Sequence, residues 1–169
     1  MDIFEFAMKM ERDGQAFYER QAAAASNPEL KEVLSTLAEE EKNHYDYFRR
    51  LRDNPDDLKH QSIPTGSKAL TKVRNIFEDM SNKKDAPLFG DEVRSVWTEA
   101  LRIEEQAEQF YKNKADEESD PVKKELLLKI AAVEYTHIQM IDGVLMYIKD
   151  PASFADSAEF KDFRSLEGW

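Results

Sequence analysis

The sequence predicts an all-α protein, a four-helix bundle made of two antiparallel helical hairpins with a long connection between them. The first observation is composition, because the 169 residues include only 5 glycines and 6 prolines while 35% are charged, and this favours long helices over a sheet. The second is periodicity, since apolar residues recur at spacings of three and four along four long segments. The third is that prolines fall between those segments.

The four segments are expected to form helices at residues 2–26, 28–52, 91–118 and 121–149. Pro28 opens the second helix and Pro121 opens the fourth, because proline suits the first turn of a helix. The links before these two prolines are short. Helices one and two, and helices three and four, should therefore form two antiparallel hairpins.

A long connection at residues 53–90 separates the hairpins. A helix of about 26 residues is roughly 39 Å long, and the connection is long enough to run the length of such a bundle. Apolar residues within it indicate a short helix at about residues 68–80. We therefore expect a bundle domain at residues 1–149 with one long crossover, which is the ferritin-like topology, and a short C-terminal segment at 150–169.

Charge and composition exclude several classes of function. The net charge of −11 argues against binding nucleic acid or an anionic membrane through the general electrostatic field. The chain has no cysteine, which excludes disulfides, thiolate zinc sites and cysteine-ligated iron–sulfur clusters. The sequence shows neither an apolar stretch of about 18 residues nor a basic segment followed by an apolar run at its start. We expect no membrane span, no signal peptide and a cytoplasmic location.

The two hairpins repeat each other in sequence. A shift of 93 residues places Pro28 on Pro121, and 13 of the 38 positions from Ala7 to His44 then match without a gap. The matches include three pairs of acidic or histidine residues: Glu11 with Glu104, Glu41 with Glu134, and His44 with His137. A duplicated hairpin is the simplest interpretation, and it implies a pseudo-twofold axis through the bundle.

These matched residues lie on the apolar stripes of the helices. Each stripe contains one glutamate, and helices two and four add a histidine three residues later, on the same helix face. An ionised carboxylate that is buried without a partner is costly, so the pattern requires a compensating charge. The candidate residues are Glu11, Glu41, His44, Glu104, Glu134 and His137.

A metal centre would supply that compensation. Two single glutamates and two Glu-x-x-His pairs are the ligand set of a dinuclear carboxylate site in a helix bundle. Four carboxylates balance two divalent cations, and carboxylate with imidazole suits iron or manganese, with zinc as a further alternative. The competing interpretation is a register wrong by one residue, which would turn these side chains to water. The apolar residues of all four helices and the duplication argue against that interpretation.

Other polar and small residues adjoin the candidate ligands. Tyr18 and Tyr111 lie two turns along from the single glutamates, and they are either aromatic core residues or hydrogen-bond donors to a ligand carboxylate. Gly14 and Ala107 lie one turn along. They leave room either for an oxidant or a mobile carboxylate, or for close approach of the helices. Four further acids are interpreted as solvated or outer charges, with the first two contributing least: Glu39, Glu40, Glu105 and Glu108.

At this point the residues resemble the rubrerythrin-type branch of the ferritin-like superfamily. The similarity covers about residues 1–149 and includes the run Glu39–His44, the Phe-Tyr pairs of helices one and three, and the second Glu-x-x-His. It implies a non-haem di-iron centre that reacts with hydrogen peroxide or dioxygen, with Glu41 and Glu134 bridging the two iron ions. The resemblance implies terminal ligation by two pairs, Glu11 with His44 and Glu104 with His137.

Two features differ from that family. Rubrerythrins carry a rubredoxin-like module in which four cysteines hold one iron, and this sequence has no cysteine. They also have an extra glutamate one turn after the helix-three ligand, where this sequence has Ala107. The six-ligand set that remains is similar to that of bacterioferritin ferroxidase centres.

The expected function is that of a di-iron-carboxylate oxidoreductase, a peroxidase or a ferroxidase. Its oxidant is hydrogen peroxide or dioxygen, and its reductant is ferrous iron or an external electron donor. The alternative is an iron-binding or storage protein with little turnover, and a metal-free or zinc-filled relic is a third interpretation. We expect a homodimer or a higher oligomer.

Overall fold

The computed structural model of this protein describes residues 3–54, 72, 75 and 91–150. Four long helices lie in these ranges: α1 (Ile3–Ala24), α2 (Pro28–Asp53), α4 (Asp91–Glu117) and α5 (Pro121–Lys149). The predicted all-α fold class is confirmed. Two expected segments, the short helix at 68–80 and the C-terminal segment at 150–169, lie outside the described residues, apart from residues 72, 75 and 150. None of the four long helices carries an apolar stretch sufficient to span a bilayer.

Side-chain caps explain where the second helix of each hairpin begins. Asn27 Oδ1 accepts a hydrogen bond of 2.8 Å from a backbone amide in the first turn of α2, and Asp120 Oδ1 accepts one of 2.9 Å in the first turn of α5. Pro28 and Pro121 follow these caps at positions that need no amide donor. Because the two caps are also related by the shift of 93 residues, both hairpins turn in the same way.

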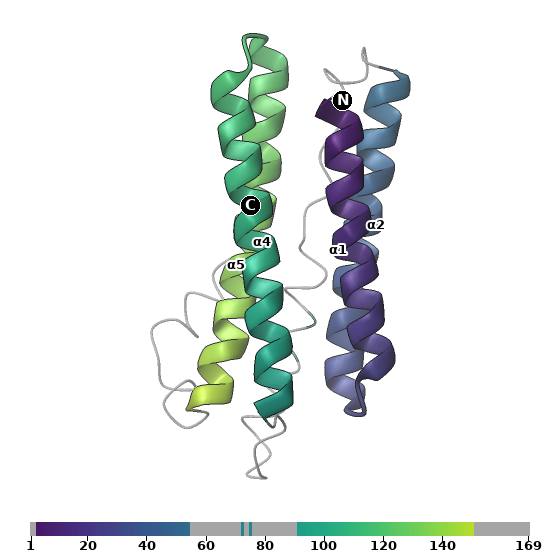
Figure 1. The fold of residues 1–169 in the computed structure, drawn as a ribbon, viewed down its shortest axis with the longest axis vertical. Coiled ribbons are helices and arrows are strands. Elements are labelled where there is room, and N and C mark those ends of the chain that lie inside the picture. The colour runs from purple at the N-terminus through teal and green to yellow at the C-terminus, as the bar shows by residue number, and fades with distance from the viewer. Residues whose placement is uncertain (1–2, 55–71, 73–74, 76–90, 151–169) are drawn as a thin grey trace.

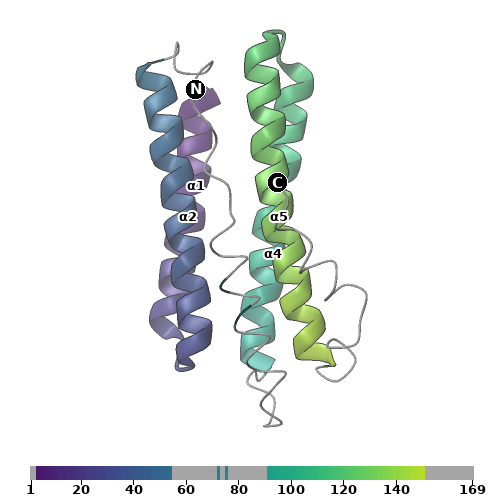
Figure 2. The same cartoon turned by 180° about the vertical axis from the view of Figure 1, so that it is seen from behind.

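The two hairpins stand side by side with their long axes in nearly the same direction (Figures 1 and 2). In both views α1 lies against α2 and α4 lies against α5. Contact between the hairpins includes a stacked pair of rings, Phe6 of α1 and Phe110 of α4, whose centroids are 4.4 Å apart. The observed arrangement is the predicted bundle of two antiparallel hairpins.

The apolar core is divided into two clusters, each built from all four helices. The first cluster includes Phe17, Leu34, Trp97 and Ile141. The second includes Phe4, Phe48, Tyr111 and Leu127. In every helix, buried glutamate or histidine side chains fall between the residues of the two clusters. A polar layer therefore crosses the middle of the bundle with apolar packing on both sides.

Candidate metal centre

The polar layer consists of seven buried acidic and histidine side chains, and every helix contributes. They are Glu11, Glu40, Glu41, His44, Glu104, Glu134 and His137. Six of the seven are the candidate ligands named from the sequence, and none of those six is more than 4% exposed. The structure thus brings together all six at the level where the apolar stripes are interrupted.

Nδ1 of His137 faces three carboxylates. It lies 3.5 Å from Glu104 Oε2, 3.5 Å from Glu134 Oε2 and 3.6 Å from Glu41 Oε1. Each of the four residues places one candidate ligand atom within 4.8 Å of the others. We call Glu41, Glu104, Glu134 and His137 the His137 group.

Nδ1 of His44 also faces carboxylates, at slightly longer range. It lies 3.3 Å from Glu11 Oε2, 3.8 Å from Glu134 Oε1 and 4.0 Å from Glu41 Oε2. Glu11, His44 and Glu134 have ligand atoms within 4.8 Å of one another, and we call them the His44 group. Glu134 belongs to both groups, and the two imidazole rings lie 5.9 Å apart with planes only 17° from parallel. The arrangement has the form of two adjacent positions that share a carboxylate.

Several atoms of the layer have no hydrogen-bond partner among the described residues. They are Glu41 Oε1, both carboxylate oxygens of Glu134 and Nδ1 of His137. Buried polar atoms are rarely left in this state, because the loss of hydration is then uncompensated. Carboxylate oxygens and an imidazole nitrogen that converge in this way are a donor set for iron, manganese or zinc. The residues present therefore fit a pair of metal ions.

Two tyrosines connect the hairpins through Glu11 and Glu104, which we call the outer glutamates. The hydroxyl of Tyr111 in α4 donates a hydrogen bond of 2.5 Å to Glu11 in α1, and the hydroxyl of Tyr18 in α1 donates to Glu104 in α4. Burial, together with the charge of the adjacent glutamate, raises the pKa of each tyrosine well above its usual value, so both hydroxyls remain donors. Of the two interpretations of these tyrosines, the structure supports hydrogen bonding to a candidate ligand, and the bond reaches the opposite hairpin.

Ionisation is disfavoured at Glu41 and Glu134, which we call the central glutamates. Burial raises the pKa of Glu41 well above its usual range, and the charges of Glu104 and Glu11 raise it further. Burial and the charge of Glu11 raise the pKa of Glu134 to about 7. Folding therefore favours the protonated forms of these two carboxyls when no cation is bound, and a metal ion would displace those protons.

The outer glutamates and the histidines form ion pairs instead. Burial opposes ionisation of Glu11, but its hydrogen bond with His44 and the charge of that imidazole outweigh burial and lower the pKa of Glu11. Burial likewise opposes ionisation of Glu104, and the charge of His137 outweighs it and lowers the pKa. Burial lowers the pKa of each histidine, yet the paired glutamates raise it above its usual value, most strongly for His137. Folding thus favours the protonated form of each imidazole at the place where a cation would be bound.

Glu40 is a member of the layer whose importance the sequence did not reveal. It is 7% exposed, and its Oε2 lies 3.1 Å from Nε2 of His137. Of the two interpretations given for these acids, a solvated charge fits Glu39, which is exposed, and an outer charge beside a candidate ligand fits Glu40. A sequence signal did exist, because Val33, Glu40 and Tyr47 recur every seven residues beside the main stripe of α2, and all three are buried.

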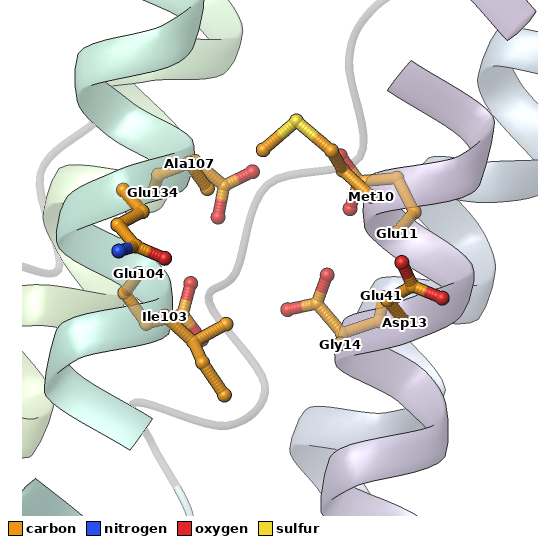
Figure 3. A pocket seen from close by; sticks show the side chains of 10 residues that line it. Met10, Glu11, Asp13, Gly14, Glu41, Ile103, Glu104, Ala107 and Glu134 are labelled. Atoms are coloured by element: carbon orange, nitrogen blue, oxygen red, sulfur yellow. The ribbon is translucent and has the colours of Figure 1, made fainter. Parts of the chain in front are cut away.

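A cavity of about 200 Å³ opens between α1 and α4 beside the polar layer (Figure 3). The carboxylates in its wall are those of Glu11, Asp13, Glu41, Glu104 and Glu134. Gly14 and Ala107, which the shift of 93 residues relates, also line it. A Cβ atom at position 14 would lie 3.3 Å from Glu41 Oε2, tighter than most contacts of that kind. The small residues therefore leave room beside the candidate ligands.

The fold and the polar layer define a class of protein. A four-helix bundle with two single glutamates and two Glu-x-x-His pairs directed at its centre has the arrangement of the dinuclear carboxylate proteins of the ferritin-like type. The family model described as Rubrerythrin matches residues 2–145, and the chain belongs to the rubrerythrin family. Family and buried cluster together indicate a di-iron protein. Comparison with curated proteins gave no match, and comparison with solved structures gave none either.

Proposed function

We propose that this protein is a non-haem di-iron-carboxylate oxidoreductase that reduces hydrogen peroxide or dioxygen, with ferrous iron or an external donor as the source of electrons. The observation that carries the proposal is the polar layer, where two groups of ligand atoms share Glu134 and several buried atoms lack hydrogen-bond partners. Membership of the rubrerythrin family, whose members react with peroxide or oxygen, supports the same chemistry.

The two groups suggest how the ligands are divided. The His137 group would hold one iron ion and the His44 group the other, with Glu134 contributing to both. Glu41 belongs to the first group and also approaches Nδ1 of His44 to 4.0 Å. That position suits the bridging role that the family resemblance implies for Glu41 and Glu134.

The chain's own residues orient the ligands and control access to them. Tyr18 and Tyr111 fix the outer carboxylates by hydrogen bonds across the hairpins, while Glu41 Oε1 has no such bond among the described residues. Gly14 accommodates the Glu41 carboxylate, because a Cβ atom at this position would lie only 3.3 Å from Glu41 Oε2. Bound iron would supply the redox chemistry, since two ferrous ions provide the two electrons that, with two protons, reduce one hydrogen peroxide to two waters.

The cavity supports a small oxidant as the substrate. Its volume is about 200 Å³, and a water molecule takes up about 30 Å³ in the liquid, so peroxide or dioxygen fits with room to spare. Its wall includes carboxylates of both groups. An oxidant that enters between α1 and α4 would meet the candidate ligands without passing through the apolar clusters.

Elemental analysis of protein purified with native metal supply, followed by anaerobic stopped-flow oxidation, tests the proposal. We expect two iron ions per chain and fast oxidation of the ferrous protein by stoichiometric hydrogen peroxide. The double variant Glu41→Ala with Glu134→Ala should lose two-metal binding, while Glu39→Ala, at an exposed neighbouring position, should retain it. Retention of both ions by the double variant would show that the site is wrong.

The same experiment separates turnover from storage. An iron-binding or storage protein would hold many iron ions per chain in a particle far larger than a dimer, and its ferrous form would not turn over peroxide with an added donor. An oxidoreductase would hold two ions and oxidise the donor repeatedly. Size-exclusion chromatography with iron analysis of the same peak gives both quantities.

A further inference from the structure

We propose that Glu40 is a positioning residue that makes the two metal positions unequal, so that the His137 position holds a divalent cation more tightly than the His44 position. The inference rests on the proposed metal centre and adds an order of occupancy to it. Three observations lead to it: the contact between Glu40 and His137, the residue that replaces Glu40 in the other hairpin, and the number of candidate ligands in each group.

The contact fixes which nitrogen of His137 can bind metal. Nε2 lies 3.1 Å from Glu40 Oε2, and Nδ1 faces the three carboxylates of the His137 group. A carboxylate at Nε2 accepts the proton of that nitrogen and so leaves the lone pair on Nδ1 free. Such an outer carboxylate orients the ring and makes the imidazole a stronger donor.

The other hairpin has a different residue at the equivalent place. The shift of 93 residues that relates His44 to His137 places Glu40 on Val133, a buried side chain with no polar atom. The ion pairs that His44 makes with described residues all run through Nδ1. His137 therefore has a carboxylate behind its ring, supplied by α2, and the duplication supplies none from α5 to His44.

The number of converging ligands also favours the His137 position over the His44 position. Four candidate ligand residues converge within 4.8 Å in the His137 group and three in the His44 group, because Glu41 lies 3.6 Å from Nδ1 of His137 but 4.0 Å from Nδ1 of His44. More anionic ligands hold a divalent cation more strongly. The closer approach of Glu41 and the oriented imidazole thus act on the same metal position, and both favour it.

Cobalt(II) titration of the full chain, first stripped of metal with a chelator, tests the order of occupancy. Calorimetry and the visible absorption of bound cobalt should resolve two steps that differ at least about tenfold in dissociation constant, and Glu40→Val should weaken the tighter step by about 10- to 100-fold. Glu39→Val changes the exposed neighbouring acid and should leave both steps unchanged. Two equal steps in the unmodified chain, or equal weakening of both by Glu40→Val, would overturn the proposal.

Nitrogen-15 NMR of the three histidines identifies which position fills first. With one equivalent of zinc, the signals of His137 should change to a form with metal on Nδ1 and a proton on Nε2, while those of His44 remain as in the metal-free chain. First occupancy at His44, or simultaneous change of both, would contradict the inference. Neither outcome depends on enzymatic activity.

A conservative variant keeps the test informative if Glu40→Val does not fold. Glu40→Gln retains an oxygen that can accept the Nε2 proton, so it should keep the His137 tautomer and weaken the tighter step by less than about tenfold, a smaller loss than removal of the acceptor causes. Glu40→Ala also removes the acceptor and replaces Glu40→Val if the valine variant does not fold. A loss as large in Glu40→Gln as in the variant without an acceptor would mean that charge alone matters and would refute positioning. Failure of the unmodified chain to bind cobalt would instead refute the metal centre itself.

Discussion

The two hairpins place the same ligand types at the same level of the bundle, but they support them differently. Glu11 and His44 of the first hairpin correspond to Glu104 and His137 of the second, and all four are buried. Behind the imidazoles the copies differ, since Glu40 contacts His137 and Val133 takes the place of Glu40 in the second copy. Duplication of the candidate ligands therefore does not make the two metal positions equal, because the residues around each ligand come from both hairpins.

The largest expected effect on metal binding comes from substitution of Glu41 or Glu134. The shift of 93 residues relates these two glutamates, but they do not belong to the same number of ligand groups. Glu134 belongs to both ligand groups and Glu41 to one. Glu134→Ala should therefore lose both metal ions, each step weakening by more than the roughly 100-fold that outer residues cost, while Glu41→Ala should retain one ion at the His44 position, whose Nδ1 Glu41 approaches only to 4.0 Å. Elemental analysis after gel filtration counts the ions. Retention of one ion by both variants would show that the two glutamates are equivalent.

The next effect is the dependence of metal binding on pH. Metal must displace the protons that Glu41, Glu134, His44 and His137 hold because their pKa values are raised. Affinity should rise about tenfold per pH unit for each proton displaced, so added metal should raise the melting temperature more at about pH 8 than at about pH 6. Differential scanning fluorimetry with and without zinc measures this shift. A larger shift at the lower pH would contradict the assignment of protons to the layer.

The metal-free protein should show the opposite trend. A glutamate or histidine whose pKa is raised by folding takes up protons on folding, and its contribution to stability is lost as the pH rises through the folded pKa. Because Glu134 has a pKa of about 7, the free energy of unfolding of the chelator-treated chain should fall between about pH 6 and pH 8. Urea unfolding at the two pH values measures it, and a rise over this window would refute the shift.

A smaller effect tests the symmetry of the tyrosine contacts. Tyr18→Phe and Tyr111→Phe each remove a hydrogen bond to a buried carboxylate of the opposite hairpin. Each should lower the free energy of unfolding by about 1–3 kcal/mol, while Tyr135→Phe, at a side chain 50% exposed, should change it little. Urea unfolding of the three variants makes the comparison. Losses confined to one of the two buried tyrosines would show that the hairpins differ here as well.

The smallest effect concerns the paired small residues of the cavity. Gly14→Ala gains up to about 1 kcal/mol of helix propensity, offset by the contact of 3.3 Å that its Cβ would make with Glu41 Oε2. Ala107→Gly should cost about 1 kcal/mol. We expect a net change in unfolding free energy near zero for the first variant and a loss for the second, measured by urea unfolding. A large gain for Gly14→Ala would mean that the Glu41 carboxylate gives way freely.

Helix periodicity was enough to predict the fold class and the level of the polar layer. It fixes which side chains face inward, and the six candidate ligands lie on that face in register with apolar residues. It does not fix which inward-facing side chains of different helices touch. Tyr111 illustrates the limit, because it lies seven residues, roughly 10 Å of helix, from the glutamate of its own helix and bonds instead to Glu11.

Glu40 is a second residue whose contact with another helix could not be predicted from the sequence. Its neighbours in sequence suggest an outer charge, and only the approach of α5 to α2 makes it the partner of His137. The cavity between α1 and α4 is likewise a property of packed helices, although Gly14 hinted at the space. A sequence predicts which face of a single helix is buried, whereas the contacts between side chains of different helices are known only from the folded bundle.

Both ligand groups contain residues from both hairpins, so neither hairpin by itself carries a complete set. The protein is in this respect a covalent version of a two-hairpin dimer. Because one chain carries both hairpins, the covalent connection replaces dilution with a local effective concentration of one hairpin around the other. A chain cut between α2 and α4 should consequently need a higher protein concentration than the intact chain to assemble the polar layer.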